Sequence, residues 1–278
     1  MGNDHFVPQL LLRRFTHDGR RETPIVAYDL ARGAFTEQPI SRVCTMEDLN
    51  SVDEVVIRRA EAAGVTFDKE SLERGIGREI ETPFANALER IERHPAKLKD
   101  GDVDWLGSYV AFQLVRTPWA MGRHAHEAGG KISYREVLAR MLREQPVVFD
   151  LIKERNWSLW QAEADAGDYV ISDNPVQLMS REGRLLELTP RGLAKRNGVL
   201  TMPLTKRLLV RAEYDAPGGV TIPTPREMVA RYNSATTAGA VRAVYMPERE
   251  FAIWDGSKIQ LVNEACPRTY RYDRTGSA

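Results

Sequence analysis

The sequence predicts an α+β fold, in which a helical middle region packs on a mixed or antiparallel sheet built from amino-terminal and carboxy-terminal strands. Three observations lead to this prediction: a strand pattern near residue 25, helical spacing of apolar residues between about residues 52 and 155, and further strand patterns after residue 156. No repeat, low-complexity tract or obvious linker divides the chain. We therefore expect one domain that covers residues 1–278.

The amino-terminal segment predicts a short helix followed by a hairpin. Pro8 can begin the helix because the first turn does not need its missing N–H group. Residues 24–30 alternate like a strand, and residues 31–34 form a plausible turn into residues 35–37. These two strands are the expected amino-terminal part of the sheet.

The middle of the chain predicts a series of helices. A short helix runs from Glu54 to Ala63, and a longer one from about Lys69 to Arg93. Pro83 predicts a kink or a restart within the longer helix. The next helix begins at Asp102 and breaks at Thr117-Pro118. Two further helices are expected over residues 133–143 and 146–155.

The last part of the chain predicts strands and one helix. The strand candidates are residues 157–162, 168–172, 198–202 and 207–211, and the segment 203–206 separates the last two. Thr224, Pro225 and Glu227 are typical of a helix start, with threonine at the cap. We expect that helix to reach about Ala243.

Composition indicates an ordinary soluble protein. The chain is 42% hydrophobic and 28% charged, and its formal net charge is zero, so it has no global attraction to nucleic acid or anionic lipid. Between Arg181 and Arg211 eight basic residues face two acidic ones. Such a stretch can contact phosphates, although a solvated face is the commoner explanation. The eight are Arg181, Arg184, Arg191, Lys195, Arg196, Lys206, Arg207 and Arg211.

The cysteines and the amino terminus indicate a cytoplasmic protein. Cys44 and Cys266 lie too far apart to suggest a metal-ligand spacing or a disulfide framework, and they fit a reducing compartment. The first residues lack the basic and apolar regions of a signal peptide. No apolar run approaches membrane-spanning length, so we expect no membrane partner.

Polar residues stand where apolar ones are expected in the helix that begins at Asp102. Gln113 and Arg116 continue the stripe formed by Leu106 and Tyr109. Arginine keeps its charge in proteins, so a buried Arg116 must meet an acid, a phosphate or several carbonyl groups. The plain alternative is a structural pair between Arg116 and a carboxylate.

Glu81 is the predicted partner of Arg116. It shares a helix face with Phe84 and Leu88, whereas Glu79 falls on the polar side. Pro83 interrupts the helical phase, so this selection depends on how the chain restarts there.

Three other positions are candidates for chemistry. Ser172 and Asp173 follow a strand, where loops often carry functional side chains, although Asp-Asn-Pro is also ordinary turn chemistry. Asn233 lies on the apolar side of a predicted helix, where it could orient a ligand or a water, or bond a neighbouring backbone. His5 could be a general base, a metal ligand or a helix-entry residue, and the structural alternative is the commoner one.

Several blocks resemble a known bacterial family. The blocks are His5-Phe6-Val7-Pro8-Gln9, Gln113-Leu114-Val115-Arg116-Thr117-Pro118, Ile171-Ser172-Asp173-Asn174-Pro175-Val176 and Met202-Pro203-Leu204-Thr205, with Asn233 in a late helix. In this order they are similar to the family catalogued as domain of unknown function 4238, over roughly residues 4–245. Leu11 stands where family members often have an aromatic residue. The resemblance supports the candidate residues and names no reaction.

These observations lead to a first hypothesis of a hydrolase acting on a phosphate-containing substrate, such as a nuclease-like effector. His5, Glu81 and Asp173 would be catalytic, while Gln113, Arg116, Ser172 and Asn233 would bind a small-molecule or nucleic-acid substrate. His5 with Glu81 or Asp173 could hold a divalent metal, which the sequence does not require. One alternative is a non-catalytic regulatory protein that binds a small molecule or nucleotide. The other is a buried network that only fixes helix packing.

Overall fold

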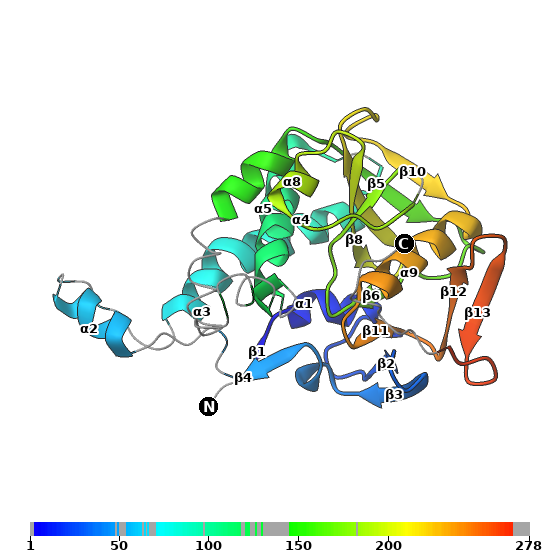
Figure 1. Cartoon of the computed structure of the whole chain (residues 1–278), viewed down its shortest axis with the longest axis horizontal. Coiled ribbons are helices and arrows are strands. Elements are labelled where there is room, and N and C mark those ends of the chain that lie inside the picture. The colour runs from blue at the N-terminus through cyan, green and yellow to red at the C-terminus, as the bar shows by residue number, and fades with distance from the viewer. Residues whose placement is uncertain are drawn as a thin grey trace.

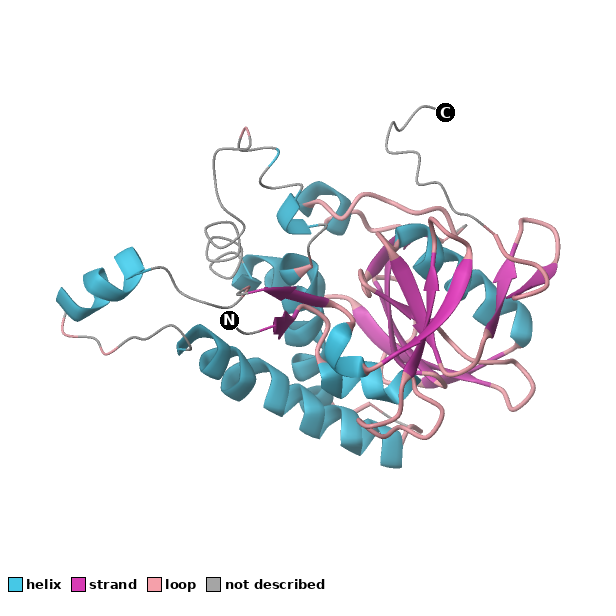
Figure 2. Ribbon diagram, turned by 90° about the horizontal axis from the view of Figure 1, so that it is seen from below, coloured by secondary structure: helices cyan, strands magenta, loops and turns pink. Residues whose placement is uncertain are grey.

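The helices of the middle of the chain gather on one side of the molecule, and most strands lie on the other together with the late helix (Figures 1 and 2). This arrangement comes from a computed structural model, which describes residues 3–47, 54–62, 71–96, 98–117, 145–181 and 183–268, together with residues 49, 64, 66, 120–122, 126 and 129. The predicted α+β class is confirmed. Among the described residues, no helix is both long enough and apolar enough to cross a membrane.

The amino-terminal segment forms a short antiparallel ribbon and a short helix. Strand β1 (Asn3–His5) pairs with β4 (Thr45–Glu47), and His5 lies opposite Thr45. Helix α1 (Gln9–Leu12) follows, with Pro8 at its cap as predicted, and a 3-10 turn covers Arg13–Phe15. Leu11, Leu12 and Phe15 are fully buried, which anchors this segment in the core.

A four-stranded antiparallel sheet joins the two ends of the chain. Its order is β3 (Ala34–Gln38), β2 (Ile25–Asp29), β11 (Ala243–Met246) and β6 (Ile171–Ser172). The predicted hairpin is β2 and β3, and its turn contains Gly33 at φ 63°, a left-handed conformation that glycine adopts without steric penalty. Strands from both ends therefore share one sheet, as the sequence predicts.

A second, five-stranded sheet comes entirely from the carboxy-terminal half. Its order is β10 (Thr221–Thr224), β5 (Asn156–Ala162), β9 (Leu208–Glu213), β8 (Gly198–Thr205) and β7 (Gln177–Ser180). Strand β10 runs parallel to β5, whereas the other neighbours are antiparallel, so the sheet is mixed.

Three predicted boundaries are wrong in this half of the chain. Residues 203–206 do not separate two strands, because β8 continues through Pro203 to Thr205 and a register shift at that point accommodates the missing N–H group. Thr224 does not cap the late helix, because it ends β10 and Pro225 occupies the cap. Helix α9 (Arg226–Gly239) then ends before the predicted Ala243, since Ala243 begins β11.

The middle of the chain is helical, with a wide turn inside the longest predicted helix. Helix α2 covers Glu54–Ala62, and α3 (Ser71–Ile76) leads into a π-helical turn over Gly77–Glu81 before α4 (Thr82–Arg93). In this turn the Thr82 N–H group donates to the Gly77 carbonyl, five residues back. The wider turn relieves the clash that Pro83 would make with the preceding carbonyl in a regular helix.

Helix α5 (Asp100–Arg116) packs against α4 and aligns the two polar residues of interest. The rings of Phe84 and Tyr109 stack between these helices, with centroids 3.5 Å apart and planes 4° from parallel. Glu81 lies one turn before Phe84, and Arg116 lies two turns after Tyr109. The stacked rings therefore fix the place where Glu81 meets Arg116.

The remaining elements complete the fold. Residues 145–153 are helical, close to the predicted 146–155, whereas the predicted helix over residues 133–143 lies outside the described residues. Helix α8 (Pro190–Leu193) is a single turn, and α9 contacts the hairpin of β12 (Glu250–Trp254) and β13 (Ile259–Asn263).

Candidate functional site

A polar cavity of about 460 Å³ lies where the amino-terminal segment meets the helices. In Figure 1 this is the region where β1 and α1, in dark blue, lie beside α3 and the lower end of α5. The cavity brings together three of the predicted site residues, His5, Glu81 and Arg116. The other lining residues are Asp4, Pro8, Gln9, Leu10, Arg13, Arg21 and Glu73. We refer to this space as the His5 cavity.

Arg116 and Glu81 form a short ion pair in the wall of the His5 cavity. Arg116 Nη1 donates to Glu81 Oε1 at 2.6 Å, and the two side chains are 1% and 20% exposed. The predicted choice of Glu81 as the partner is therefore confirmed. The guanidinium also stands over the Phe112 ring, 4.9 Å from its centroid. Among the described residues nothing accepts a hydrogen bond from the buried Arg116 Nε.

Gln113 lies deeper in the same helix and does not line the cavity. Its Nε2 donates to the Tyr109 hydroxyl at 3.0 Å, and its buried Oε1 has no hydrogen-bond partner in the part of the chain that the structure describes. Burial raises the pKa of Tyr109 well above its ordinary value, so this phenol stays neutral and can accept from Gln113. Gln113 thus supports the helix that carries Arg116, and its predicted role in substrate binding stays a prediction.

His5 is held as a neutral ring. Its Nε2 lies 3.2 Å from the Ile40 carbonyl oxygen, and Gln9 Nε2 lies 3.4 Å from its Nδ1. Because a carbonyl oxygen can only accept, the Nε2 atom carries the hydrogen and Nδ1 holds a lone pair. Burial is the main cause that lowers the pKa of His5, and Arg116 lowers it further, while the Ile40 carbonyl and Glu81 act in the opposite direction.

Ser172 and Asp173 lie outside the lining of the His5 cavity and make local hydrogen bonds. The two carboxylate oxygens of Asp173 accept from the backbone N–H groups of Val241 and Arg242 at 2.8 and 2.7 Å. Burial raises the pKa of Asp173, and these hydrogen bonds offset part of that rise. The Ser172 hydroxyl bonds the Asn174 backbone within the same turn. These contacts fix the end of α9 to the four-stranded sheet.

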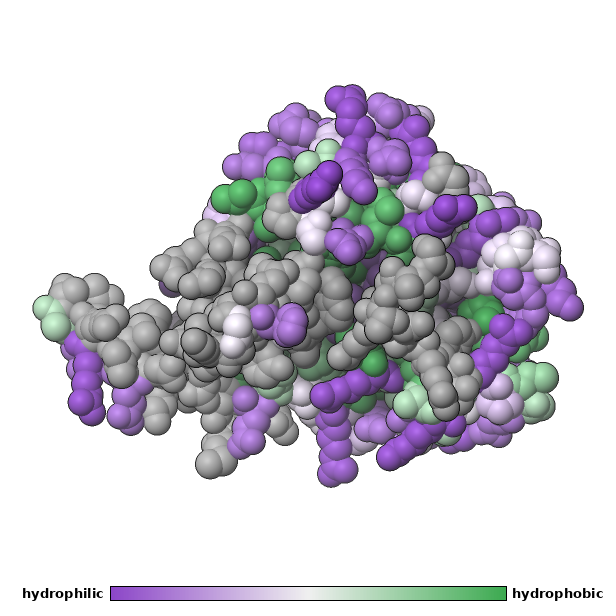
Figure 3. All heavy atoms as spheres, viewed as in Figure 1, coloured by the Kyte–Doolittle hydropathy of each residue, from purple (hydrophilic) through white to green (hydrophobic). Residues whose placement is uncertain are grey.

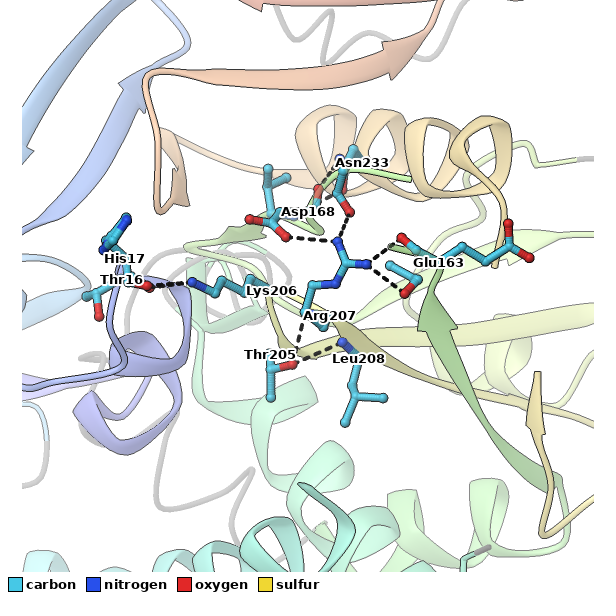
Figure 4. A network of polar contacts seen from close by, with 12 residues as sticks. Thr16, His17, Glu163, Asp168, Thr205, Lys206, Arg207, Leu208 and Asn233 are labelled. Carbon is cyan, nitrogen blue, oxygen red and sulfur yellow. Dashed lines mark hydrogen bonds and ion pairs between the residues drawn. The ribbon is translucent and has the colours of Figure 1, made fainter. Parts of the chain in front are cut away.

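Asn233 also makes a full set of framework contacts. Its Oδ1 accepts from the Val170 N–H group at 3.0 Å, and its Nδ2 donates to the carbonyl oxygens of Asp168 and Ala252 at 2.9 and 3.1 Å. Figure 4 shows Asn233 beside the Asp168 loop, which Arg207 also holds through Asp168 Oδ1 at 3.3 Å. Asn233 therefore ties a loop and a strand to α9. Neither Asn233 nor Asp168 lines the His5 cavity.

The basic stretch of the carboxy-terminal half is largely compensated by acids and carbonyl groups. Arg181 pairs with Asp215 at 2.8 Å, and Arg211 pairs with Glu213 at 2.7 Å. Lys206 donates to the His17 carbonyl oxygen at 2.6 Å, a contact that Figure 4 displays. Hydrophilic side chains cover the upper edge of the face in Figure 3, around α8, and the exposed Arg191, Lys195 and Arg196 belong to or follow that helix. A solvated face is therefore the better description of this stretch.

Gln9 and Arg21 are among the lining residues to which the sequence analysis gave no role. Arg21 Nε donates to Gln9 Oε1 at 2.9 Å. The spacing of His5 and Gln9, four residues apart across Pro8, was the available signal. Within the described residues, no group of three or more histidine, cysteine, aspartate and glutamate side chains is arranged to hold a metal ion.

Comparisons with known proteins give a family without an assigned activity. No curated protein and no solved structure matches the chain. A family model described as "Protein of unknown function (DUF4238)" matches residues 3–250, which include the whole lining of the His5 cavity. The chain therefore belongs to the DUF4238 family.

Proposed function

We propose that the His5 cavity is an active site that hydrolyses a small phosphate-containing substrate. The observation that carries the proposal is the presence of a neutral histidine and a buried arginine, His5 and Arg116, in the wall of one cavity. A neutral imidazole can take a proton from water, and an arginine can bind a phosphate through its planar set of donors.

Arg116 supplies the proposed phosphate contact. Its guanidinium is already placed by Glu81 and by the Phe112 ring, so little side-chain freedom is lost when an anion binds. Arg13 and Arg21 add positive charge to the same cavity, opposite Asp4, Glu73 and Glu81. With three arginines and three acids the lining is formally neutral, so binding depends on placement of the donors rather than on excess charge.

His5 supplies the proposed general base. Nδ1 accepts a proton from a water molecule as the water oxygen forms a bond to phosphorus, and the bond from phosphorus to the leaving oxygen breaks. The protonated ring then returns its proton to the leaving oxygen, so atoms and charges balance. Arg116 stabilises the negative charge on the phosphoryl oxygens during this exchange. Glu81 is a positioning residue in this scheme, because it orients Arg116.

The size and surroundings of the cavity favour a small molecule over a polynucleotide. A volume of about 460 Å³ is within the range of small-molecule sites. The eight basic residues between Arg181 and Arg211 all lie in the described part of the chain, and none of them lines the cavity. A nuclease would need a basic track that leads to its active site. We therefore propose small phosphate esters, rather than nucleic acid, as the substrate class.

One observation favours a second candidate, a receptor that binds a phosphorylated molecule without turnover. Gln9 donates to His5 Nδ1 at 3.4 Å, which occupies the lone pair that a base must use. If the bound ligand leaves Gln9 in place, His5 only completes the wall of a binding site.

The test compares hydrolysis and binding in matched variants. Wild-type protein is assayed with p-nitrophenyl phosphate, bis(p-nitrophenyl) phosphate and a panel of nucleoside monophosphates and triphosphates, and ligand-induced thermal shifts are recorded for the same compounds. His5→Gln should lower kcat/KM at least about 100-fold, the usual contribution of a general base. Arg116→Gln should abolish both turnover and the thermal shift.

The controls are a histidine and an arginine outside the cavity. His17 is 75% exposed, and Arg14 is buried and paired with Glu92 at 2.9 Å, so His17→Gln and Arg14→Gln repeat the chemical changes elsewhere. Both controls should keep activity. A thermal shift without turnover supports the receptor, and full activity in His5→Gln overturns the proposal.

A further inference from the structure

Gln9 lies between Arg21 and His5 in a chain of hydrogen bonds along the wall of the His5 cavity. Arg21 Nε donates to Gln9 Oε1 at 2.9 Å, Gln9 Nε2 lies 3.4 Å from His5 Nδ1, and His5 Nε2 lies 3.2 Å from the Ile40 carbonyl oxygen. The chain therefore runs from a guanidinium through an amide and an imidazole to a backbone carbonyl.

The two ends of this chain fix the direction of every hydrogen bond within it. A guanidinium can only donate, so the amide atom that meets Arg21 must be the oxygen of Gln9. The Ile40 carbonyl can only accept, so the ring atom that meets it must carry a hydrogen. The Gln9 amide consequently turns its NH₂ group toward Nδ1, and this nitrogen must accept.

We infer that Gln9 is a positioning residue that holds His5 in the Nε2–H tautomer, with the Nδ1 lone pair directed at a replaceable donor. The inference rests on the proposed function, because Nδ1 is the atom that would take a proton from water. A separation of 3.4 Å exceeds the usual 2.7–3.2 Å of a strong hydrogen bond, so a water or a substrate hydroxyl can displace the amide.

The local backbone explains how Gln9 comes to face His5. Pro8 is extended, with φ −61° and ψ 146°, and it caps α1, whose first residue is Gln9, only three residues after β1 ends at His5. The charged groups that act on the His5 ring are Arg116, Glu81 and Arg21. Of these three groups, Arg21 is the one that Gln9 bridges to the ring. The Gln9 amide thus separates the Arg21 guanidinium from Nδ1, and Arg21 sets the orientation of the amide that Nδ1 meets.

The experiment is a nitrogen NMR titration of the full chain labelled with ¹⁵N-histidine, recorded without substrate. His5→Gln identifies the signals of His5, one of five histidines. In the wild type, His5 should show a protonated Nε2 and an unprotonated Nδ1 at pH 7. Gln9→Glu places a carboxylate beside Nδ1, which should favour a hydrogen on Nδ1 while Nε2 keeps its own for the Ile40 carbonyl, and so increase the proton affinity of the ring about tenfold or more.

Two further variants make the result decisive. Gln161→Glu adds the same charge on an exposed position of β5, and it should leave the His5 titration unchanged. Gln9→Met keeps the size of the side chain and removes its donor, so the Nδ1 signal should move toward that of a nitrogen without a hydrogen bond. This variant gives a readout if Gln9→Glu fails to fold.

An Nδ1–H tautomer in the wild type, or an unchanged His5 titration in Gln9→Glu, overturns the inference. The proposed hydrolase fails by a different result, the absence of turnover, and the tautomer is measured without substrate. If the protein is active, Gln9→Glu should also shift the acid limb of the pH–rate profile upward with the His5 titration.

Discussion

Removing the charge of Glu81 should destabilise the protein and disable Arg116 together. In Glu81→Gln the guanidinium stays buried at 1% exposure but loses the anion that it meets at 2.6 Å. Removing one partner of a fully buried pair costs about 3–5 kcal/mol in free energy of unfolding. Glu81 is 20% exposed, and glutamine keeps an acceptor oxygen for the same contact, so we expect about 2–3 kcal/mol.

The expected change in melting temperature follows from the size of the chain. An unfolding entropy of about 2.1 cal/mol/K per residue, over 278 residues, gives about 0.6 kcal/mol/K. A loss of about 2–3 kcal/mol should therefore lower Tm by about 3–5 °C. Circular dichroism melts supply Tm, and urea unfolding supplies the free energy at 25 °C.

A double-mutant cycle separates the pair from its surroundings. Arg116→Met removes the buried charge, so adding Glu81→Gln to it should cost less than Glu81→Gln costs alone. Glu92→Gln is the matched control, because Arg14 and Glu92 form a similar pair with side chains 7% and 33% exposed. Glu92→Gln should lower stability without changing phosphate binding at the His5 cavity. A Tm change below about 1 °C in Glu81→Gln, or full additivity in the cycle, would refute the reasoning.

Three further predictions follow from the same structure. Burial lowers the pKa of His5 below its ordinary 6.5, so the unfolded chain takes up a proton at a higher pH than the folded protein does. The free energy of unfolding should therefore fall as the pH drops below about 6.5. Urea melts at pH 7.5 and 5.5 should show a smaller fall in His5→Gln than in the wild type. Asp173→Asn turns an amide donor toward the N–H group of Val241 or Arg242, so it should lower the free energy of unfolding by about 1–3 kcal/mol in urea melts. An unchanged Tm in circular dichroism melts would contradict this. Gly239→Ala would drive a methyl group into the buried Gln177 amide and should also lower the free energy of unfolding by about 1–3 kcal/mol. Gly101 has open space around it, so Gly101→Ala should be neutral or stabilising. Equal Tm values for the two variants would rule this out.

Helical periodicity located the ion pair because both partners lie on stripes of apolar residues. Tyr109 and Arg116 are two turns apart in α5, and Glu81, at the end of the π-helical turn, lies one turn before Phe84 of α4, so stacking of the two rings aligns the two charges. The π-helical turn was not predictable from the stripe. Its extra residue rotates the preceding segment by about 100° relative to α4, and Glu81 is the last residue of this turn.

Short strands escaped prediction because three or four residues carry too little pattern. Strands β1, β4 and β7 are held by pairing with distant segments, which a local pattern does not contain. The β12–β13 hairpin is the exception, since Asp255-Gly256 between two apolar runs is a usable signal for a hairpin turn. Its turn is closed by hydrogen bonds from Ser257 and Lys258 to Asp255 Oδ1.

Sequence alone could not separate the polar residues of the framework from those of the candidate site. Asp173 and Asn233 find their partners far along the chain, in Val241 and Arg242 for the first and in Val170 and Ala252 for the second. Asn233 looked like a site residue for the same reason that Arg116 did, a polar group on an inward helix face, and Asp173 did because it follows a strand. Only tertiary contacts show what each group meets.

Asp173 and Asn233 use their polar atoms within the fold. Both oxygens of Asp173 accept backbone hydrogens, and the Asn233 amide uses its oxygen once and its nitrogen twice, so every polar atom of the two side chains has a framework partner. Arg116 Nε and Gln113 Oε1 are buried without a partner among the described residues, and His5 Nδ1 has only a long contact to Gln9. Unsatisfied buried atoms cost free energy, but they do not mark a site by themselves, because Arg155 Nε, Trp157 Nε1, Tyr169 Oη and Arg211 Nε are also buried without a partner in the described part of the chain and none of them lines the His5 cavity. The cavity that His5, Gln9, Glu81 and Arg116 line is therefore the observation on which we propose a functional site there, while the hydrogen bonds of Asp173 and Asn233 support a framework role for these two residues.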